Sequence, residues 1–243
     1  MTTLYLIPTS LGPTELATIL PAEVCAVTAS LHHFVAENAK TARAFLKQVN
    51  VSHPLSIALQ EIHITELNIN TPAAELSALL DPLRAGFNVG VLSEAGVPAV
   101  ADPGASLVRL AHAEGITVKP LVGPSSILLA LMASGLNGQS FAFHGYLPTD
   151  ASMRSKRIKL LEQRSQQENQ TQIFIETPYR NQALLEAMLS NCNGQTLVCV
   201  ATDLTLASES IKTQTADAWK RDIAKGRLPD FHKKPTVFLF LAE

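Results

Sequence analysis

Four turns rich in glycine, proline and small hydroxyl side chains are the places where this chain could bind a ligand. Glycine lets a ligand approach the backbone closely, and proline fixes a loop so that little entropy is lost on binding. Where such a turn leads into a helix, a serine can cap the helix, or the free N–H groups can meet a carboxylate. Any one of these turns alone is typical of an ordinary connection between elements. Four such turns at the same edge of a sheet would be stronger evidence of a ligand site. The turns are Pro8–Pro13, Ser93–Gly104, Gly123–Ser126 and Glu176–Arg180.

Each turn follows a strand-sized apolar run, and stretches with helical periodicity lie between the runs. This alternation predicts an α/β fold with largely parallel sheets, whose ligands bind outside the carboxyl ends of the strands. We therefore expect the four turns to converge on one such edge. The expected strands are Leu4–Ile7, Val24–Val27, Val89–Leu92, Phe141–Phe143, Ile173–Ile175, Leu197–Val200 and Val237–Leu241, with a further stretch at Val118–Val122.

The clearest helical pattern begins with Thr71 as the N-cap and Pro72 at the first helical position, and Gly86 ends it. Its leucines follow the spacing of a buried helix face, although Pro82 predicts an irregular last turn. These leucines are Leu76, Leu79, Leu80 and Leu83. The other expected helices are Ala105–Glu114, Ser126–Ser134, Arg180–Ser190 and Ala216–Lys225.

A chain of 243 residues is long enough for two modest domains, each with its own core. Proline and glycine punctuate the stretch from Lys119 to Pro124, and a border there leaves halves of similar size. We expect two α/β domains, residues 1–119 and residues 120–243.

Composition excludes several classes of function. The net charge of −2 does not favour generic electrostatic binding of nucleic acid or lipid. No apolar stretch reaches transmembrane length, and the first ten residues lack a signal peptide's charged n-region, so we expect a cytoplasmic protein that does not bind membranes.

The three cysteines have no metal-binding spacing and are expected to be reduced core thiols, and the histidines are scattered, so we expect no metal. The glycine fingerprints of dinucleotide-binding and P-loop enzymes and the nucleophile elbow of α/β-hydrolases are missing.

Five segments in order resemble the tetrapyrrole methylase family of S-adenosylmethionine (SAM) methyltransferases. They are LYLIPTSLG at 4–12, LSEAGVPAVADPG at 92–104, VGPSSILLALMASGL at 122–136, FAFHGYLP at 141–148 and IFIETPYR at 173–180. Within the family, the chain is most similar to the branch that methylates a cytidine ribose 2′-hydroxyl of 16S ribosomal RNA. The resemblance implies two α/β domains, SAM bound in the cleft between them, and a homodimer.

The resemblance also implies which residues contact the cofactor. Pro8 and Gly12 match the loop after the first strand, and Glu176 matches a strand-end position that faces the cofactor. Ser93, Gly96, Val97 and Pro98 match the loop under the methionine moiety, with Ser125 and Ser126 as the hydroxyl pair beside it. Leu204, Pro235 and Thr236 match the stretches that contact the adenosine end.

The acceptor side departs from the ribosomal RNA branch. Its Glu-Asp-Thr-Arg motif is Glu37-Asn38-Ala39-Lys40 here, and its Arg-Glu-Leu-Thr-Lys motif is Thr202–Leu206, which has lost both cations. RNA, a tetrapyrrole or another small molecule therefore remain alternative acceptors, and a SAM-binding protein without catalysis is a third alternative. If a ribose hydroxyl is the acceptor, its proton needs a base. Glu94 and Asp102 are the candidates, together with Glu37, and Tyr179 and Arg180 would orient the substrate; Asp102 could equally cap the following helix.

One basic cluster could contact RNA phosphates. Arg154, Lys156, Arg157, Lys159 and Arg164 surround Ile158 and Leu161, which are expected to form the buried stripe of a helix. The alternative is an ordinary solvated helix face.

Overall fold

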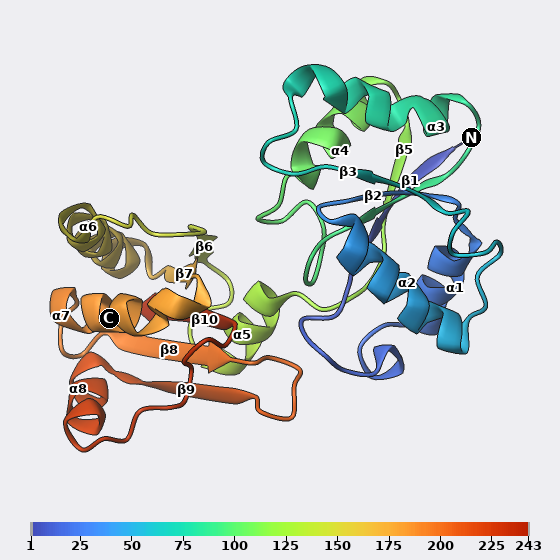
Figure 1. The fold of residues 1–243 in the computed structure, drawn as a ribbon. Helices are drawn as coiled ribbons and strands as arrows, with labels where there is room; N and C mark the ends of the chain where they lie inside the picture. The colour runs from blue at the N-terminus through green and yellow to red at the C-terminus, as the bar shows by residue number, and fades with distance from the viewer. Residues whose placement is uncertain (1, 243) are drawn as a thin grey trace. The chain divides into compact units, whose positions relative to one another are not determined.

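The computed structural model of the chain describes residues 2–242 and divides into two compact units, Met1–Ser125 and Ser126–Glu243 (Figure 1). The expected border after Lys119 falls inside the strand Thr117–Pro120, which pairs with the first strand of the chain. We therefore place the border at Ser125.

The first unit is a five-stranded sheet, in the order β3-β2-β4-β1-β5, in which all four pairings are parallel. This confirms the expected parallel α/β fold for the first half of the chain. Its strands are β1 (Thr3–Ile7), β2 (His33–Ala36), β3 (His63–Glu66), β4 (Val89–Leu92) and β5 (Thr117–Pro120). Its helices are α1 (Ala22–Ser30), α2 (Ala39–Ser52), α3 (Asp81–Arg84) and α4 (Gly104–Ala113), with the 3₁₀ helices η1 (Leu16–Thr18) and η2 (Ala73–Leu80).

Helices cover both faces of this sheet, as the nearly continuous apolar strands require. α1 and α2 pack with Ile7 and Phe34 on one face. η2, α3 and α4 pack with Leu4 and Val35 on the other. Successive residues of a strand point to opposite faces, so Phe34 and Val35 enter different cores.

Two expectations for this unit are wrong. Val24–Val27 lies within α1, because a short apolar run alone does not distinguish a buried strand from one side of a buried helix. The helix expected from Thr71 is the 3₁₀ helix η2 with Pro72 as its N-cap residue, followed by the short α3. Pro82 has no N–H to donate to the carbonyl four residues earlier, so one continuous α-helix is not possible there.

The second unit is also five-stranded, in the order β6-β7-β10-β8-β9. Only β6 and β7 pair in parallel, and the other three pairings are antiparallel, so the expectation of mostly parallel sheets is wrong for this unit. Its strands are β6 (Phe141–Phe143), β7 (Thr171–Ile175), β8 (Leu197–Thr202), β9 (Ser210–Thr215) and β10 (Thr236–Leu241). Its helices are α5 (Ser126–Ser134), α6 (Ala151–Glu168), α7 (Asn181–Asn191) and α8 (Ala216–Ala224), with the 3₁₀ helix η3 (Pro178–Arg180).

Three helices cover one face of the second sheet. α6, α7 and α8 pack around Phe174, Phe238 and the buried Trp219. Ile158 and Leu161 of α6 are buried there, as expected. α5 packs against β8, β9 and β10 on the other face.

Candidate functional site

The carboxyl ends of three neighbouring strands of the first unit lie in register. Ile7 of β1 and Ala36 of β2 both pair with Leu92 of β4. The residues that follow these strand ends, Pro8, Glu37 and Ser93, therefore begin their loops side by side. Parallel pairing thus brings the loop after β1 and the loop after β4 together, as the sequence predicts.

Hydrogen bonds hold these two loops together. The Thr9 N–H donates to the carbonyl of Gly96 at 2.9 Å, and its hydroxyl donates to the carbonyl of Ser93 at 3.2 Å. The Ser93 hydroxyl donates back to the Gly96 carbonyl at 2.7 Å. Thr9 and Ser93 are both buried, so these bonds are shielded from water and fix the turn. Pro8 and Pro98 are also buried, and Gly12 and Val97 are half-buried.

The third turn meets the other two at glycines. Gly96 has φ +78°, and a Cβ there would lie 3.2 Å from the carbonyl oxygen of Pro124. A Cβ on Gly123 would overlap the ring of Pro8. The three turns of the first unit therefore converge with no space for larger side chains. Ser125 ends this unit and Ser126 begins α5, and both are half-buried.

Asp102 braces the second half of the loop after β4. Its Oδ1 accepts the N–H groups of Ala99 and Gly104, both at 2.8 Å. Between these bonds, Ala99 and Ala101 have φ +65° and +63°, which is a strained conformation for alanine. Burial raises the pKa of Asp102, and the two N–H bonds oppose that rise. The geometry is that of a bracing residue at the start of α4, which was the alternative to a catalytic role.

A cavity of about 150 Å³ lies beside the converging loops. Glu94 lines it and accepts a 2.6 Å hydrogen bond from the hydroxyl of Thr41 on α2. Burial raises the pKa of Glu37, and the charges of Asp102 and Glu94 raise it further, against a hydrogen bond from the Glu94 N–H. The three expected carboxylates are thus close enough to interact. The lining residues are Thr9, Ser10, Ala36, Thr41, Ala42, Ala44, Phe45, Gln48, Leu92, Ser93 and Glu94.

The remaining expected cofactor residues gather at one edge of the second sheet. β10 runs antiparallel to both β7 and β8, so its first residue, Thr236, lies at the edge where β7 and β8 end. Glu176 follows β7 at this edge. Leu204 follows β8 there, and the Asp203 N–H donates to the carbonyl of Pro235 at 3.0 Å. The turn Glu176–Arg180 therefore follows a strand of the second sheet, so the expectation that all four turns converge on one sheet edge is wrong.

Glu176 is buried and paired with a cation. Its Oε1 accepts the N–H of Thr177 at 2.7 Å and contacts Arg180 Nη2 at 2.6 Å. Arg180 is therefore held in place by Glu176, and it is not free to orient a substrate without breaking this pair.

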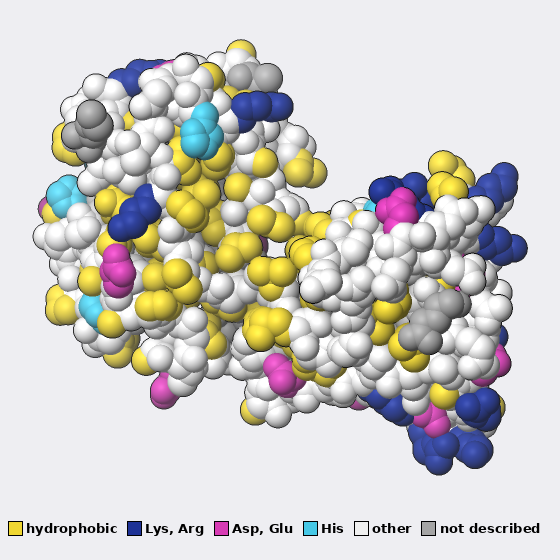
Figure 2. Space-filling model, turned by 180° about the vertical axis from the view of Figure 1, so that it is seen from behind, with side chains coloured by type: hydrophobic (Ala, Val, Ile, Leu, Met, Phe, Trp, Pro, Cys, Tyr) yellow, Lys and Arg dark blue, Asp and Glu magenta, His cyan; other side chains and the backbone are white. Residues whose placement is uncertain are grey.

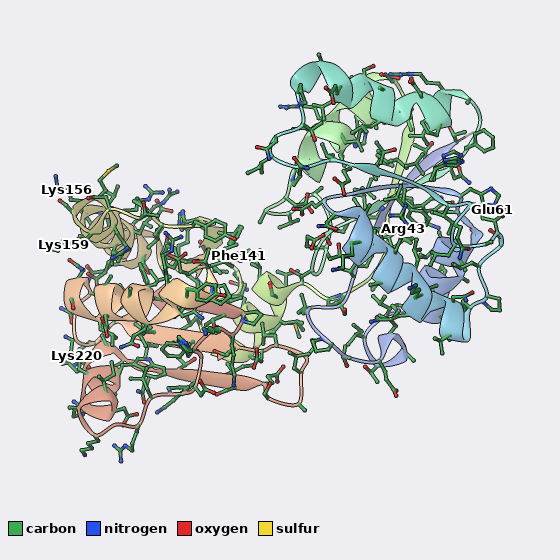
Figure 3. The ribbon with its side chains drawn as sticks, viewed as in Figure 1. Arg43, Glu61, Phe141, Lys156, Lys159 and Lys220 are labelled. Carbon is green, nitrogen blue, oxygen red and sulfur yellow. The ribbon has the colours of Figure 1, made fainter. Side chains whose placement is uncertain are left out.

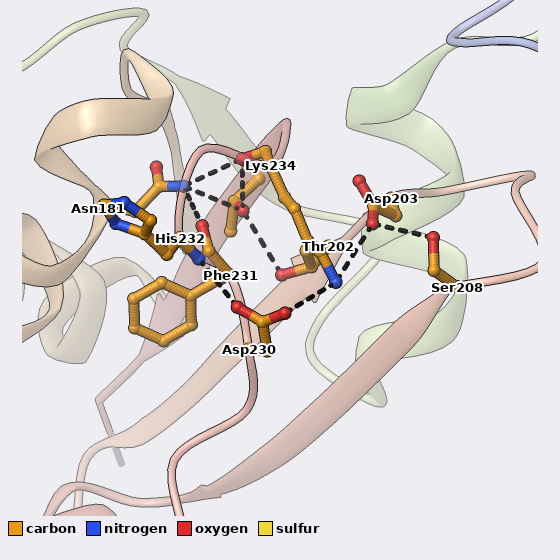
Figure 4. A network of polar contacts seen from close by, with 9 residues as sticks. Asn181, Thr202, Asp203, Ser208, Asp230, Phe231, His232 and Lys234 are labelled. Atoms are coloured by element: carbon orange, nitrogen blue, oxygen red, sulfur yellow. Dashed lines mark hydrogen bonds and ion pairs between the residues drawn. The ribbon is translucent and has the colours of Figure 1, made fainter.

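A polar network supports the loop that precedes β10 (Figure 4). The side-chain amide of Asn181, at the start of α7, donates to the carbonyls of Phe231 and Lys234 at 2.9 and 2.8 Å, and lies 3.2 Å from Thr236 Oγ1. Lys234 also pairs with Asp230 at 3.2 Å and with Asp203 at 3.6 Å. This network fixes Pro235 and Thr236 at the edge beside Glu176.

Sequence reasoning did not single out Thr9 or Asn181. Thr9 lies inside the predicted turn, but nothing local shows that it bonds to residues more than eighty positions away. For Asn181 the sequence does offer a signal. It stands at helical spacing from Leu184, Leu185 and Met188, so it falls on the buried face of α7, and it is 1% exposed. A buried polar side chain needs hydrogen-bond partners, and these come from a loop fifty residues later.

The cysteines, the metal-binding side chains and the apolar helices are each expected from the sequence to have no special role. Cys25, Cys192 and Cys199 are buried and form no disulfide. Within residues 2–242, no group of three His, Cys, Asp or Glu side chains could hold a metal ion. In the same range, no helix is both long and apolar enough to span a membrane.

Comparison with known structures defines the fold class. The structure of the methyltransferase CobJ aligns with 99% of this chain and 93% of its own, with a TM-score of 0.62 and 17% sequence identity. The chain thus shares the α/β fold of this solved structure.

Sequence comparison defines the family. Residues 3–219 match the model for tetrapyrrole (corrin/porphyrin) methylases, and the chain belongs to this family. It is 32% identical over 209 residues to ribosomal RNA small subunit methyltransferase I of Vibrio cholerae, covering 86% of this chain and 67% of the relative. It is 38% identical over 140 residues to the protein of that name from Mesorhizobium japonicum, covering 58% of this chain and 46% of the relative. The chain therefore spans between about half and two thirds of the length of these curated relatives.

Proposed function

We propose that the chain is a SAM-dependent methyltransferase whose acceptor is a ribose hydroxyl of RNA. The observation that supports this most directly is the convergence of the Pro8–Gly12 and Ser93–Pro98 loops, held by Thr9. All the expected cofactor residues except Pro235 and Thr236 lie in the range matched by the family model. The similarity to ribosomal RNA small subunit methyltransferase I favours RNA within the family.

The residues present fit SAM. Gly96 and Gly123 stand where a Cβ would crowd neighbouring atoms, so the loops offer a tight, mostly neutral turn with hydroxyl and backbone groups. Such groups can bind adenosine and an amino acid without a strong charge of their own. Ser93, Gly96, Val97 and Pro98 would hold one end of the cofactor, and Leu204, Pro235 and Thr236 would hold the other. When bound, SAM supplies an activated methyl group.

The protein's contribution is then to align the acceptor, exclude water and take a proton from the hydroxyl. Glu37 suits the last task better than Glu94 or Asp102. Asp102 Oδ1 is occupied by two backbone N–H groups, and Glu94 accepts from Thr41. Glu37 lies at the same strand edge, and its raised pKa makes its carboxylate a stronger base than an ordinary glutamate.

A small-molecule acceptor, such as a tetrapyrrole, is the second candidate. The net charge of −2 and the two cations that are missing at 202–206 favour it over a highly charged substrate. The cavity of about 150 Å³ beside Glu94 is smaller than typical ligand pockets, which argues against a whole macrocycle in that cavity alone.

Two measurements on the full chain test the proposal. SAM at a hundred times its Kd is expected to stabilise the fold by about 2.7 kcal/mol, seen as a rise in the melting temperature. Radiolabelled SAM is then offered with small ribosomal subunits and, separately, with tetrapyrroles. We expect label in ribose of the RNA. Label only in a tetrapyrrole would select the second candidate, and SAM binding without transfer to either would support a non-catalytic protein.

A further inference from the structure

An exposed aromatic ring and an unpaired lysine meet at the edge of the second unit that carries Glu176. Tyr179, in η3, is 77% exposed, and Lys233 Nζ lies 5.8 Å from the centroid of its ring. Lys233 belongs to the loop before β10 and has φ +58°, so the backbone turns sharply there. Among the described residues, Lys233 forms no ion pair.

The two parts of this site come from segments far apart in the sequence, and Asn181 joins them. Asn181 lies two residues after Tyr179, and its amide donates to the carbonyls of Phe231 and Lys234, on either side of Lys233. These hydrogen bonds are shielded from water, because Asn181 is 1% exposed. The backbone segments that carry Tyr179 and Lys233 are therefore linked to each other before any ligand binds. A site prepared in this way loses little entropy on binding.

Among the described residues around this site, Lys233 is a cation that no carboxylate pairs with, whereas Arg180 and Lys234 are paired with acids. Arg180 follows Tyr179 directly, and Glu176 holds its guanidinium in place. The nearby acid Asp230 pairs with Lys234, and this pairing keeps the pKa of Asp230 below its usual range. Asp230 is therefore committed to Lys234 and does not neutralise Lys233. The result is an exposed aromatic ring with the positive charge of Lys233 beside it.

We propose that Tyr179 and Lys233 form a stacking site for an unpaired base of single-stranded RNA, with Lys233 contacting a flanking phosphate. Aromatic rings bind bases of any identity through their π faces, and adjacent cations bind the backbone. The inference rests on RNA as the acceptor in the proposed function. It gives Tyr179, which the sequence led us to expect only as a substrate-orienting residue, a direct contact with an RNA base.

The experiment measures binding of a fluorescently labelled single-stranded RNA of about ten nucleotides to the full chain by anisotropy. Tyr179→Ala is expected to weaken binding about tenfold, whereas Tyr179→Phe keeps the ring and is expected to bind as the parent does. Tyr146→Ala is the matched control, because Tyr146 is a second exposed tyrosine of the same unit, 57% exposed. Lys233→Gln is expected to lower the slope of log K against log salt by about 0.7, while Lys220→Gln on α8, a lysine already paired with Asp217, leaves it unchanged.

Several outcomes would overturn the stacking site. Equal affinities of Tyr179→Ala and Tyr146→Ala would do so, as would an equal loss in Tyr179→Phe, because stacking needs only the ring. SAM affinity is measured on the same proteins by calorimetry. If Tyr179→Ala weakens SAM binding and leaves RNA binding unchanged, the ring serves the cofactor and the inference is wrong. If the parent protein binds SAM and methylates a small molecule but does not bind the RNA probe, the stacking site is refuted while methyl transfer stands.

Discussion

At the scale of single residues, the structure separates side chains that brace the candidate site from those that could react. One carboxylate oxygen of Asp102 accepts hydrogen bonds from two backbone N–H groups. Thr9 and Asn181 form hydrogen bonds with loops that are distant in sequence. Glu37 accepts the N–H of Glu94, and burial together with the neighbouring carboxylates raises its pKa. This contrast leads to two predictions about residues.

The first prediction concerns the base. If Glu37 removes the acceptor proton, methyl transfer falls as pH drops through its raised pKa, because the protonated carboxyl cannot accept. Glu37→Gln is expected to lower turnover by roughly 10²–10⁴-fold, the usual contribution of a general base, and to abolish that acid limb. The pH profile of kcat, with SAM and acceptor saturating, gives the measurement.

The same substitution also changes stability with pH. A carboxyl whose pKa is higher in the folded than in the unfolded state binds more protons when folded, so stability declines as pH rises above its ordinary value. Glu37→Gln removes that loss, so the variant should be at least as stable as the parent at neutral pH. Asp102→Asn is the companion variant, since its amide oxygen can still accept both N–H bonds. Full turnover in Asp102→Asn would end its candidacy as a base, and unchanged turnover in Glu37→Gln would end that of Glu37.

The second prediction concerns Gly96. Gly96→Ala and Gly115→Ala both place alanine at positive φ, +78° and +68°, which costs about 1–2 kcal/mol in each. Only at Gly96 does the new Cβ meet other atoms, Leu11 Cδ2 at 3.0 Å and the Pro124 carbonyl oxygen at 3.2 Å. We expect both variants to lose stability in thermal melts and only Gly96→Ala to lose SAM affinity, about tenfold by calorimetry. Equal SAM affinities would remove this turn from the cofactor site.

At the scale of elements, α6 carries a cluster of basic side chains. Figure 2 shows Lys and Arg side chains gathered over α6 and, separately, over α8. Figure 3 places Lys156 and Lys159 on the outer side of α6, away from the sheet. Arg164 pairs with Glu168 at 3.1 Å, whereas in the described part of the chain Lys156, Arg157 and Lys159 form no ion pair. Three free cations on neighbouring turns suit phosphates, although a solvated helix face has the same appearance.

Charge reversal separates these two interpretations. Lys156→Glu, Arg157→Glu and Lys159→Glu together should weaken RNA binding and flatten its salt dependence, because phosphate contacts release counterions. The fold should persist, since Ile158 and Leu161, which anchor the helix, are unchanged. The control replaces Lys220, Arg221 and Lys225 around α8 with glutamate, an equal change of charge. If both triple variants bind RNA equally, α6 has only a solvated face.

At the scale of the whole molecule, the family resemblance implies a homodimer, which we retain as a proposal. Exposed apolar side chains on α5, Leu128 and Met132, are compatible with a partner surface. Sedimentation equilibrium is expected to give about twice the chain mass of 26.1 kDa. A mass of 26.1 kDa at every concentration tested would exclude the dimer.

The sequence by itself determined the local features of this protein. Apolar runs and helical periodicity placed most strands and helices, because burial acts on each segment through its own spacing. Glycine, proline and serine marked the turns at the strand ends, because only certain residues fit tight turns. The α/β class followed from these features together with the family resemblance.

Tertiary structure alone decided the direction and register of the strands and the tasks of individual polar side chains. Val24–Val27 became helix and the second sheet became mostly antiparallel, since strand direction depends on how distant segments pack. Thr9 and Asn181 form hydrogen bonds with residues far away in the sequence. Asp102 accepts a backbone N–H of its own loop and so stabilises that loop. Local sequence patterns do not predict such contacts, because these contacts form between distant segments only when the chain has folded.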